Sequence, residues 1–535
     1  MSASLGLDFG TESVRALLVT LSGRELASSV QRYRHGQLLD SLPTGGRRLP
    51  PHYALQHPDD WMASAVVAVR RSLRAASLAA QDVVGIGVDF TSCTMLPCLR
   101  DGTPLCKVQG FGREPLAWPR LWKHHGAVWA TEQINRIAAQ RREPWLRRYG
   151  GVVGLEWFFP KILEAIEDAP AVADAAEVWV EGGDWFVWQL VGGDADDLPR
   201  STCQAGYKAL WNADGGYPSQ AFLRAVNPRL ATAAVERMPG RLIAPGRAAG
   251  ALSAAAARKL GLIEGTPVSA AIIDAHAGVP GAGVSEPDTL VMVMGTSSCH
   301  MLNSRVERMV AGVAGVVKDG ILPGYYGYET GQAAVGDAFA WFRQFAGEGD
   351  FKALDSAARS LQPGADGVTC IDWFNGCRTP LMDGRLRGAL AGLHLGHGAA
   401  HGYRAVLEAS AFGLRWIVEV LREGGVPVRK FVATGGLPHH SPLLVQICAD
   451  VLNEPLAVHP STQGPALGAA ILGAIAAGAQ RTGFKSTAQA IDRMAGRARR
   501  GSKIVRPGAR RARQYVSAYR RYRQLGDAIR SLASR

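Results

Sequence analysis

Two short segments of this chain combine glycine with small hydroxyl residues in a pattern that is typical of phosphate binding. Residues 5–19 and 290–302 each read as an apolar run, a turn and a second apolar run. The turns are Gly10-Thr11 and Gly295-Thr296-Ser297. This pattern predicts a β-hairpin whose tip exposes backbone N–H groups and hydroxyls. Two such tips facing each other could hold a polyphosphate from both sides, because glycine allows close approach and the hydroxyls donate hydrogen bonds.

Two charged residues flank the first of these turns. Asp8 precedes the glycine and Arg15 follows the turn. A carboxylate beside phosphates can hold Mg²⁺ through water, and an arginine can neutralise phosphate charge. Each turn could also be a plain tight hairpin, with Asp8 as a turn former. The matching pair favours a nucleotide site between two domains.

A third acidic residue stands where a base would be needed. Asp274 follows the apolar run 268–273 and lies where a helix or turn begins. Phosphoryl transfer to an alcohol requires a group that aligns the hydroxyl and accepts its proton, and a carboxylate can do both. Taken alone, Asp274 could equally be a helix N-cap.

Three further positions could contribute to a ligand site. A strand-like run ends in Thr434-Gly435-Gly436, where bare backbone could contact a flat base, although a simple strand-to-helix turn would look similar. Lys208 and Glu329 each stand among small and aromatic residues. Lone charged residues of this kind are usually solvated.

Length and charge narrow the classes of protein. A chain of 535 residues is too long for one core, so two or more domains are expected. The net charge of +13 arises in residues 481–535, where 16 basic residues face two acidic ones, and the remainder is close to neutral. Solvated helix faces are commoner than phosphate contacts in such segments, so we predict no nucleic-acid partner.

Cysteine usage and hydropathy indicate where the protein works. The eight cysteines are Cys93, Cys98, Cys106, Cys203, Cys299, Cys370, Cys377 and Cys448. They lack the paired spacing of a zinc site or of a secreted disulfide framework, which favours reduced thiols in the cytoplasm. No leader is expected, and the apolar stretch 466–479 is short enough to be a packed helix. We therefore predict a cytoplasmic protein without a membrane span.

Strand-like and helix-like runs occur throughout the chain and predict an α/β fold. The predicted strands are 83–88, 267–273, 289–294 and 430–433, and the predicted helices are 59–76, 403–421 and 442–452. P-loop, dinucleotide-binding and protein-kinase fingerprints are absent, so another scaffold must bind the nucleotide. The two similar hairpins suggest a duplicated core.

Several sequence blocks in order resemble the FGGY carbohydrate kinases, from residue 5 to about residue 480. The blocks are Gly6-Leu7-Asp8-Phe9-Gly10-Thr11-Glu12-Ser13-Val14-Arg15, Gly85-Ile86-Gly87-Val88-Asp89-Phe90-Thr91-Ser92-Cys93-Thr94, Ile273-Asp274-Ala275-His276, Met294-Gly295-Thr296-Ser297 and Thr434-Gly435-Gly436. Within the family the chain is most similar to the ribulokinases. They share Gly87-Val88-Asp89-Phe90-Thr91, Trp122-Lys123-His124-His125, Tyr149-Gly150-Gly151, Glu156-Trp157, Ala205-Gly206-Tyr207-Lys208 and Ile371-Asp372-Trp373-Phe374-Asn375-Gly376.

The resemblance implies a two-domain actin/hexokinase-like fold of the ribonuclease H-like class, with a cleft between the domains. Residues 1–284 would form an N-terminal domain that binds the sugar and carries the first phosphate hairpin. Residues 285–480 would form a nucleotide-binding C-terminal domain, followed by a basic helical tail, 481–535.

The same resemblance assigns roles to individual residues. Asp274 is the implied catalytic base. The implied sugar-binding residues are Thr91, Thr94, Leu96, Lys208, Asp274 and Glu329. The implied ATP-binding residues are Gly10, Thr11, Arg15, Gly295, Thr296, Ser297, Gly336, Gly435, Gly436 and His440. Asp8 would organise Mg²⁺ through water.

The implied reaction is ATP-dependent phosphorylation of a small-molecule ketopentose at its terminal hydroxyl. The resemblance favours L-ribulose, the substrate in L-arabinose breakdown, with D-ribulose and D-xylulose as rivals. A homodimer is expected on general grounds. An alternative from another class is a non-catalytic, ATP-switched binding protein of the actin type, but such a protein has no need for a base together with Lys208 and Glu329.

Overall fold

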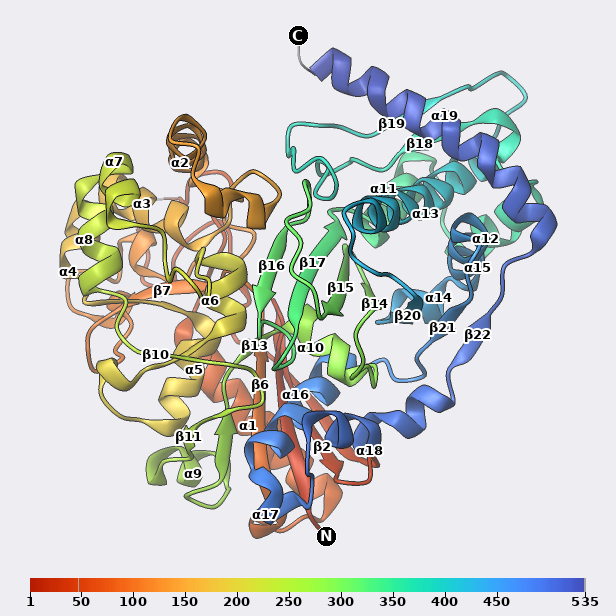
Figure 1. Ribbon diagram of the computed structural model, residues 1–535. Coiled ribbons are helices and arrows are strands. Elements are labelled where there is room, and N and C mark those ends of the chain that lie inside the picture. Colours follow the sequence, from red (N-terminus) through yellow and green to blue (C-terminus); the bar gives the residue numbers. More distant parts are fainter. Residues whose placement is uncertain (47, 534–535) are drawn as a thin grey trace.

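Two lobes, each built on a seven-stranded sheet, make up the protein (Figure 1). The structure is a computed structural model that describes residues 1–46 and 48–533. The first sheet has the order β11-β12-β6-β1-β2-β3, with β13 beside β6. Its strands are β1 (Ala3–Phe9), β2 (Ser13–Thr20), β3 (Glu25–Arg32), β6 (Val83–Phe90), β11 (Ala248–Ala251), β12 (Pro267–Ser269) and β13 (Ile272–Ile273).

The second sheet has the order β16-β17-β15-β14-β20-β21-β22. Its strands are β14 (Thr289–Met294), β15 (Ser298–Ser304), β16 (Gly315–Lys318), β17 (Tyr326–Gln332), β20 (Lys430–Thr434), β21 (Leu456–Val458) and β22 (Lys503–Val505). Both sheets contain an antiparallel hairpin whose first strand also pairs with a parallel neighbour, β1 with β6 and β14 with β20. This repeated arrangement fits the suggested duplication.

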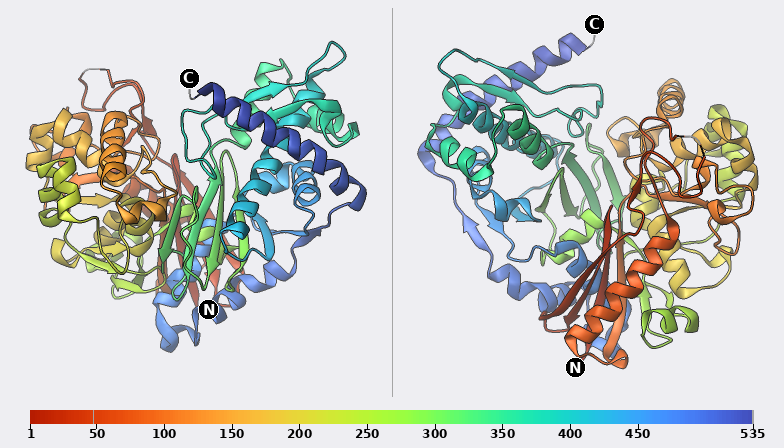
Figure 2. Two further views of the ribbon diagram at one scale, coloured as in Figure 1. Left: turned by 45° about the horizontal axis from the view of Figure 1, so that its top comes forward. Right: turned by 180° about the vertical axis from the view of Figure 1, so that it is seen from behind.

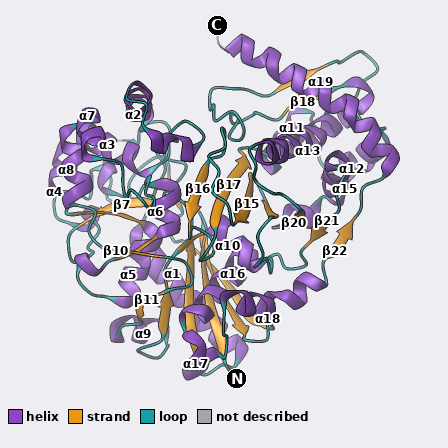
Figure 3. Cartoon of the chain, in the orientation of Figure 1, coloured by secondary structure: helices purple, strands orange, loops and turns teal. Residues whose placement is uncertain are grey.

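Helices cover the first sheet, and a second cluster of helices extends the first lobe (Figures 2 and 3). Around the sheet lie α1 (Pro58–Ala76), α5 (Gly182–Val191) and α9 (Ala254–Leu260). The extension contains α2 (Val128–Gln140), α3 (Phe158–Asp168), α4 (Pro170–Ala175), α6 (Thr202–Lys208), α7 (Gln220–Val226), α8 (Pro228–Glu236), β4 (Gln37–Leu38), β5 (Leu55–Gln56), β7 (Met95–Cys98), β8 (Val178–Glu181), β9 (Pro199–Ser201) and β10 (Arg241–Ile243). It has a hydrophobic core of its own, in which Trp179 and Phe158 are buried.

The second lobe packs its helices around the other sheet. They are α11 (Gly336–Phe345), α12 (Phe351–Ser360), α13 (Ala399–Glu423), α14 (Leu437–His440), α15 (Pro442–Leu452) and α19 (Ala509–Ala533), with a small sheet of β18 (Thr369–Ile371) and β19 (Ala389–Ala391). Tyr515, Tyr519 and Tyr522 of α19 are buried in the core of this lobe. The last helix is therefore held to the lobe by aromatic burial.

Two helices lie between the sheets and determine how the site is assembled. They are α10 (Asp274–Gly281) and α16 (Gly464–Ala476), which pack against each other and against strands of the first sheet. The backbones approach so closely that Gly468 and Gly87 must lack a side chain. A Cβ at Gly468 would collide with the Ala277 carbonyl, and one at Gly87 would collide with the Ala469 carbonyl. A helix from late in the chain thus completes the first lobe.

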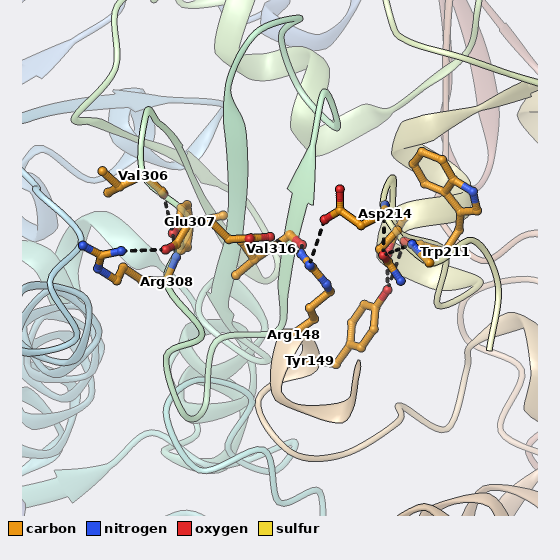
Figure 4. A network of polar contacts seen from close by, with 12 residues as sticks. Arg148, Tyr149, Trp211, Asp214, Val306, Glu307, Arg308 and Val316 are labelled. Carbon is orange, nitrogen blue, oxygen red and sulfur yellow. Dashed lines mark hydrogen bonds and ion pairs between the residues drawn. The ribbon is translucent and has the colours of Figure 1, made fainter. Parts of the chain in front are cut away.

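Polar contacts also join the lobes away from α10. Arg148, in the 3₁₀ turn before Gly150, pairs with Glu307 and donates a hydrogen bond to the Val316 carbonyl at 3.5 Å (Figure 4). The neighbouring Tyr149 hydroxyl donates to the Gly206 carbonyl at 2.7 Å. The Arg148 contacts connect the extension of the first lobe to the second lobe, including its edge strand β16, and the Tyr149 bond fixes the adjoining turn within the extension.

Most of the predicted elements are confirmed. Both hairpins form, and the predicted helices correspond to α1, α13 and α15. The run 267–273 is not one strand, because Ala270 and Ala271 separate β12 from β13. The stretch 466–479 begins inside α16, as expected of a packed helix. The domain limits at 284 and 480 stay a prediction.

The basic C-terminal segment consists of α17 (Gly478–Thr482), α18 (Thr487–Arg500), β22 and α19. Several of its arginines have partners within the chain: Arg499 pairs with Glu286, and Arg511 pairs with Asp450 at 2.5 Å. Part of the positive charge is therefore used in packing this segment. Among the described residues, no helix is both long enough and apolar enough to span a bilayer.

Candidate active site

Three carboxylates meet at the carboxyl ends of three neighbouring parallel strands. Asp8 on β1 is in register with Asp89 on β6, and β13 pairs with the same end of β6 and leads directly into Asp274. Parallel strands bring their carboxyl ends to one edge of a sheet, where ligands commonly bind. The sheet therefore places the predicted base and the predicted metal residue in one group.

Asp274 occupies the first turn of α10. Its Oδ1 accepts a hydrogen bond from the Ala275 backbone N–H at 2.7 Å. Burial raises the pKa of Asp274 to about 7, and the nearby Asp8 adds to the rise, while the Ala275 bond and Lys208 oppose it. A carboxyl group with a pKa near neutrality is suited to accept a proton from an alcohol at physiological pH.

Asp89 belongs to this group although sequence reasoning did not select it. It is fully buried, and neither carboxylate oxygen has a hydrogen-bond donor among the described residues. Burial together with Asp8 and Asp274 raises the pKa of Asp89 well above its usual range. The sequence does contain a pattern that points to Asp89, because Gly87-Val88-Asp89-Phe90 repeats the pattern of Gly6-Leu7-Asp8-Phe9 on the adjacent strand.

The first hairpin tip is held from behind by residues of the extension. The Gln56 side chain donates to the Thr11 carbonyl at 2.8 Å, and the Trp122 indole N–H donates to the Thr11 hydroxyl oxygen at 3.1 Å. Since the hydroxyl oxygen already accepts a bond, its own proton is free to be donated to a ligand. Arg15 lies 3.8 Å from Asp8, so its charge is available at this tip. Gln56 and Trp122 were not predicted as site residues.

The second hairpin tip is assembled from three distant segments. Gly336 and Val335 donate their backbone N–H groups to the carbonyls of Gly295 and Thr296, at 3.1 and 2.9 Å. Gly435, at φ +95°, packs on Met294 so closely that a Cβ would meet its carbonyl oxygen at 2.5 Å.

The remaining residues that are predicted to bind the nucleotide lie around this tip. Gly295 and Thr296 are exposed, and Ser297 is partly exposed. Gly436 is the N-cap of the short helix α14, whose last residue, His440, is exposed. The structure thus brings the predicted residues Gly295, Thr296, Gly336, Gly435 and Gly436 together.

Lys208 and Glu329 form a buried ion pair across the two lobes. The Lys208 Nζ, at the end of α6, lies 2.8 and 3.0 Å from the two carboxylate oxygens of Glu329 on β17. Arg378 pairs with the same carboxylate, and its guanidinium also donates to the Cys299 sulfur at 3.5 Å. Burial lowers the pKa of Lys208. Arg378 is a further site residue that no motif in the sequence indicated.

The predicted loop 91–96 runs into β7 at Met95; it is firmly held, and its residues differ in what they can offer a ligand. The hydroxyls of Thr91 and Thr94 bond to each other at 2.8 Å. The Leu96 side chain is fully buried in the core of the first lobe, so only its backbone could contact a sugar. The Lys161 Nζ donates to the Cys93 carbonyl at 2.6 Å, where Cys93 adopts φ +58°. Lys161 therefore fixes the shape of this loop.

The chain matches known proteins over nearly its whole length. The model of the FGGY family of carbohydrate kinases, C-terminal domain, matches residues 290–477. The chain is 42% identical to ribulokinase of Shouchella clausii (strain KSM-K16), over 98% of this chain and 94% of that protein. The chain belongs to the FGGY family of carbohydrate kinases. Two further ribulokinases are similar over 98% of this chain, that of Mycolicibacterium smegmatis (42% identity, 93% of that protein) and that of Staphylococcus aureus (strain Newman) (34%, 96%).

Solved structures of sugar kinases share the fold. Xylulose kinase of Rhodospirillum rubrum superimposes with a TM-score of 0.80 at 23% identity, covering 100% of both chains. Glycerol kinase of Plasmodium falciparum with ADP gives 0.77 at 16% identity and 98% of both chains. These likenesses bear out the predicted two-domain kinase fold. As an FGGY kinase the chain is an enzyme, and the non-catalytic actin-like alternative is set aside.

Proposed function

We propose that this FGGY kinase transfers the γ-phosphoryl group of ATP to the terminal hydroxyl of ribulose, with L-ribulose as the preferred epimer. One observation carries the proposal: the Asp274 carboxylate is near enough both to the phosphate-side residue Asp8 and to Lys208 of the buried Lys208–Glu329 pair for each to shift its pKa. The similarity to ribulokinases over 98% of the chain supports ribulose as the acceptor.

In this proposal Asp274 is the catalytic base. The terminal hydroxyl oxygen of the sugar attacks the γ-phosphorus, the bond from that phosphorus to the β–γ bridging oxygen breaks, and its electron pair leaves with ADP. The hydroxyl proton passes to Asp274. Phosphoryl transfer runs through a loose transition state, so aligning the hydroxyl matters as much as removing its proton. The pKa of Asp274, about 7, keeps a large fraction of the base deprotonated at neutral pH.

Lys208 and Glu329 are proposed to orient the sugar. Each can hydrogen-bond a hydroxyl while the other balances its charge, which suits a neutral substrate. Loop 91–96 would add backbone and hydroxyl contacts on the other side, with Thr91, Thr94 and the Leu96 backbone in reach. Epimers differ only in where one hydroxyl points, so hydrogen-bond geometry here would select among them.

The two hairpin tips are proposed to bind the phosphates of ATP. Gly10, Thr11 and Arg15 would form one clamp and Gly295, Thr296 and Ser297 the other. Gly336, Gly435, Gly436 and His440 would line the adenosine. Gly295 and Thr296 are exposed and Gly10, Thr11 and Ser297 are partly exposed, so the tips are accessible to a ligand, which supports this role.

The acidic group fits Mg²⁺. Hard carboxylate oxygens suit this ion, and Asp89 offers two buried oxygens without donors next to Asp8. Asp8 and Asp89 would hold the ion, Asp8 through water, and the ion would neutralise charge on the β- and γ-phosphates. Arg15 would balance Asp8 from the other side.

A role in L-arabinose catabolism, a cytoplasmic location and a homodimer belong to the same proposal. The eight cysteines are all free thiols, which supports a reducing compartment. Size-exclusion chromatography with light scattering would test the dimer, with a mass near 57.0 kDa contradicting it.

The deciding experiment is a coupled assay of ADP release with L-ribulose, D-ribulose, D-xylulose, L-xylulose and glycerol. We expect the highest kcat/KM with L-ribulose. A higher value with D-ribulose or D-xylulose would reassign the epimer, and ADP release that no ketopentose stimulates would contradict the proposed function.

A further inference from the structure

One lysine beside the first hairpin has no acidic partner. The Lys123 ammonium lies 5.2 Å from the centre of the Trp122 ring, a cation–π contact, and the side chain is exposed. The edge of the same ring donates the hydrogen bond to the Thr11 hydroxyl. Within residues 1–46 and 48–533, no carboxylate lies within ion-pair distance of the Lys123 Nζ. One indole therefore connects an unpaired cation to the predicted phosphate clamp.

The backbone that carries Trp122 and Lys123 is held on both sides. Toward β5, the Leu121 N–H donates to the Ala54 carbonyl at 2.9 Å, and toward β7 the Arg120 N–H donates to the Met95 carbonyl at 2.9 Å. His124, the next residue, is fully buried and bonds Glu164 at 2.9 Å. Lys123 thus projects from a rigid segment between the sugar loop and the first hairpin, where small errors of position would be costly.

On the phosphate side the acidic residues outnumber the basic ones, so a further cation such as Lys123 has a role there. In the proposed complex, Asp8, Asp89 and Asp274 would face a nucleotide that itself brings several negative charges. Arg15 and Lys208 are nearby cations, but Arg15 already neighbours Asp8 and Lys208 is paired with Glu329. Arg378 is engaged by Glu329 on the sugar side. Charge on the transferred group in phosphoryl transfer is stabilised by lysine, arginine or metal ions, and the chain has no P-loop lysine.

We propose that Lys123 is a catalytic residue that binds the γ-phosphoryl group of ATP, and that Trp122 positions both Lys123 and the Thr11 hydroxyl for it. This inference rests on the proposed function. The Lys123 ammonium donates hydrogen bonds to non-bridging oxygens of the γ-phosphoryl group and keeps its protons throughout. This interaction strengthens as negative charge collects on those oxygens. The proton of the sugar hydroxyl goes to Asp274.

The test compares Lys123→Met with Lys123→Arg and with Lys107→Met. Lys107 is a matched control, since it is an exposed lysine of the same lobe, paired with Asp59 at 2.6 Å. Calorimetry measures the affinity of each folded variant for ADP and for the non-hydrolysable analogue adenosine 5′-(β,γ-imido)triphosphate with Mg²⁺. Circular dichroism confirms folding.

For Lys123→Met we expect affinity for the analogue to fall about tenfold, as for a lost charge-assisted hydrogen bond, with ADP affinity within twofold of the parent. We also expect kcat with ribulose to fall about a hundredfold, as when one transition-state donor is removed. Lys123→Arg should keep most of the affinity for the analogue and most of kcat with ribulose. Lys107→Met should leave both quantities unchanged. Equal changes, or none, in the two nucleotide affinities overturn the assignment. Because calorimetry needs no sugar, its result is independent of which acceptor the parent phosphorylates.

Discussion

The sugar side and the phosphate side of this site differ in how deeply their polar groups are buried and in whether those groups are already paired. On the sugar side, Lys208 and Glu329 are buried and already paired, and Lys161 is fully buried beneath loop 91–96. On the phosphate side, Gly295 and Thr296 are exposed and Thr11 is partly exposed. A neutral sugar can enter a site whose charged groups are already paired with one another, whereas a polyphosphate needs donors and cations that are still free.

The comparison suggests that the sugar side determines substrate specificity and that the phosphate side adjusts when the lobes close. Buried polar groups that lack their ligand are costly, so a preorganised sugar site discriminates strongly among hydroxyl arrangements. Exposed hairpin tips on two separate sheets can adjust to ATP when the lobes move. Asp274 belongs to both sides, because it lies at the junction of α10 with the first sheet.

The largest effect is expected where the two sides meet. Asp274→Asn should lower kcat about a thousandfold, the contribution of a well-placed general base, with ATP affinity within twofold of the parent. Steady-state kinetics and calorimetry measure the two quantities. A variant that retains a tenth of parental kcat would show that Asp274 is not the base.

The stability of the same variant provides its control. Burial holds the pKa of Asp274 near 7 in the folded protein, above the unfolded value of about 4. The cost of ionising this carboxyl in the fold therefore grows as pH rises from about 4 to about 7 and is complete above 7, so Asp274→Asn should raise the melting temperature more at pH 8 than at pH 5. A lower melting temperature at pH 8 would attribute the lost activity to misfolding.

A sugar-side substitution should come next in size. Glu329→Gln removes a charge that Lys208 and Arg378 share, and we expect KM for ribulose to rise about thirtyfold, roughly the worth of a hydrogen bond to a charged group. KM for ATP should change less than threefold. An equal rise in both KM values would contradict the separation of the two sides.

The pH dependence tests the shared carboxylate without any substitution. With an Asp274 pKa of about 7, kcat/KM for ribulose should rise about tenfold per pH unit below 7 and level off above it. Initial rates from pH 5.5 to 8.5 at saturating ATP give the profile. A flat profile between pH 6 and pH 8 would mean that another group accepts the proton.

The smallest effect is expected from the support behind the first hairpin. Trp122→Phe keeps the aromatic face but removes the hydrogen bond to Thr11, and should raise KM for ATP about fivefold, the worth of one neutral hydrogen bond. In a Thr11→Val background the same substitution should add little. Full additivity of the two changes would show that Trp122 does not act through Thr11.

The sequence by itself determined the local units of this protein. Apolar runs flanking Gly10-Thr11 and Gly295-Thr296-Ser297 predicted both hairpins, and the run before Asp274 predicted a carboxylate at a strand end. Such features follow from side-chain periodicity and turn chemistry, which operate over a few residues. The roles of Lys208 and Glu329 came from family resemblance and not from periodicity.

Only the tertiary structure decided which of these units meet. The pairings of β1 and β13 with β6 place Asp89 beside Asp8 and near Asp274, and a loop more than 40 residues beyond Glu329 brings Arg378 to it. Trp122 reaches Thr11 across 111 positions in the chain. These contacts depend on how sheets and helices pack, and a lone buried acid or an isolated tryptophan carries no local pattern that distinguishes it from an ordinary core residue.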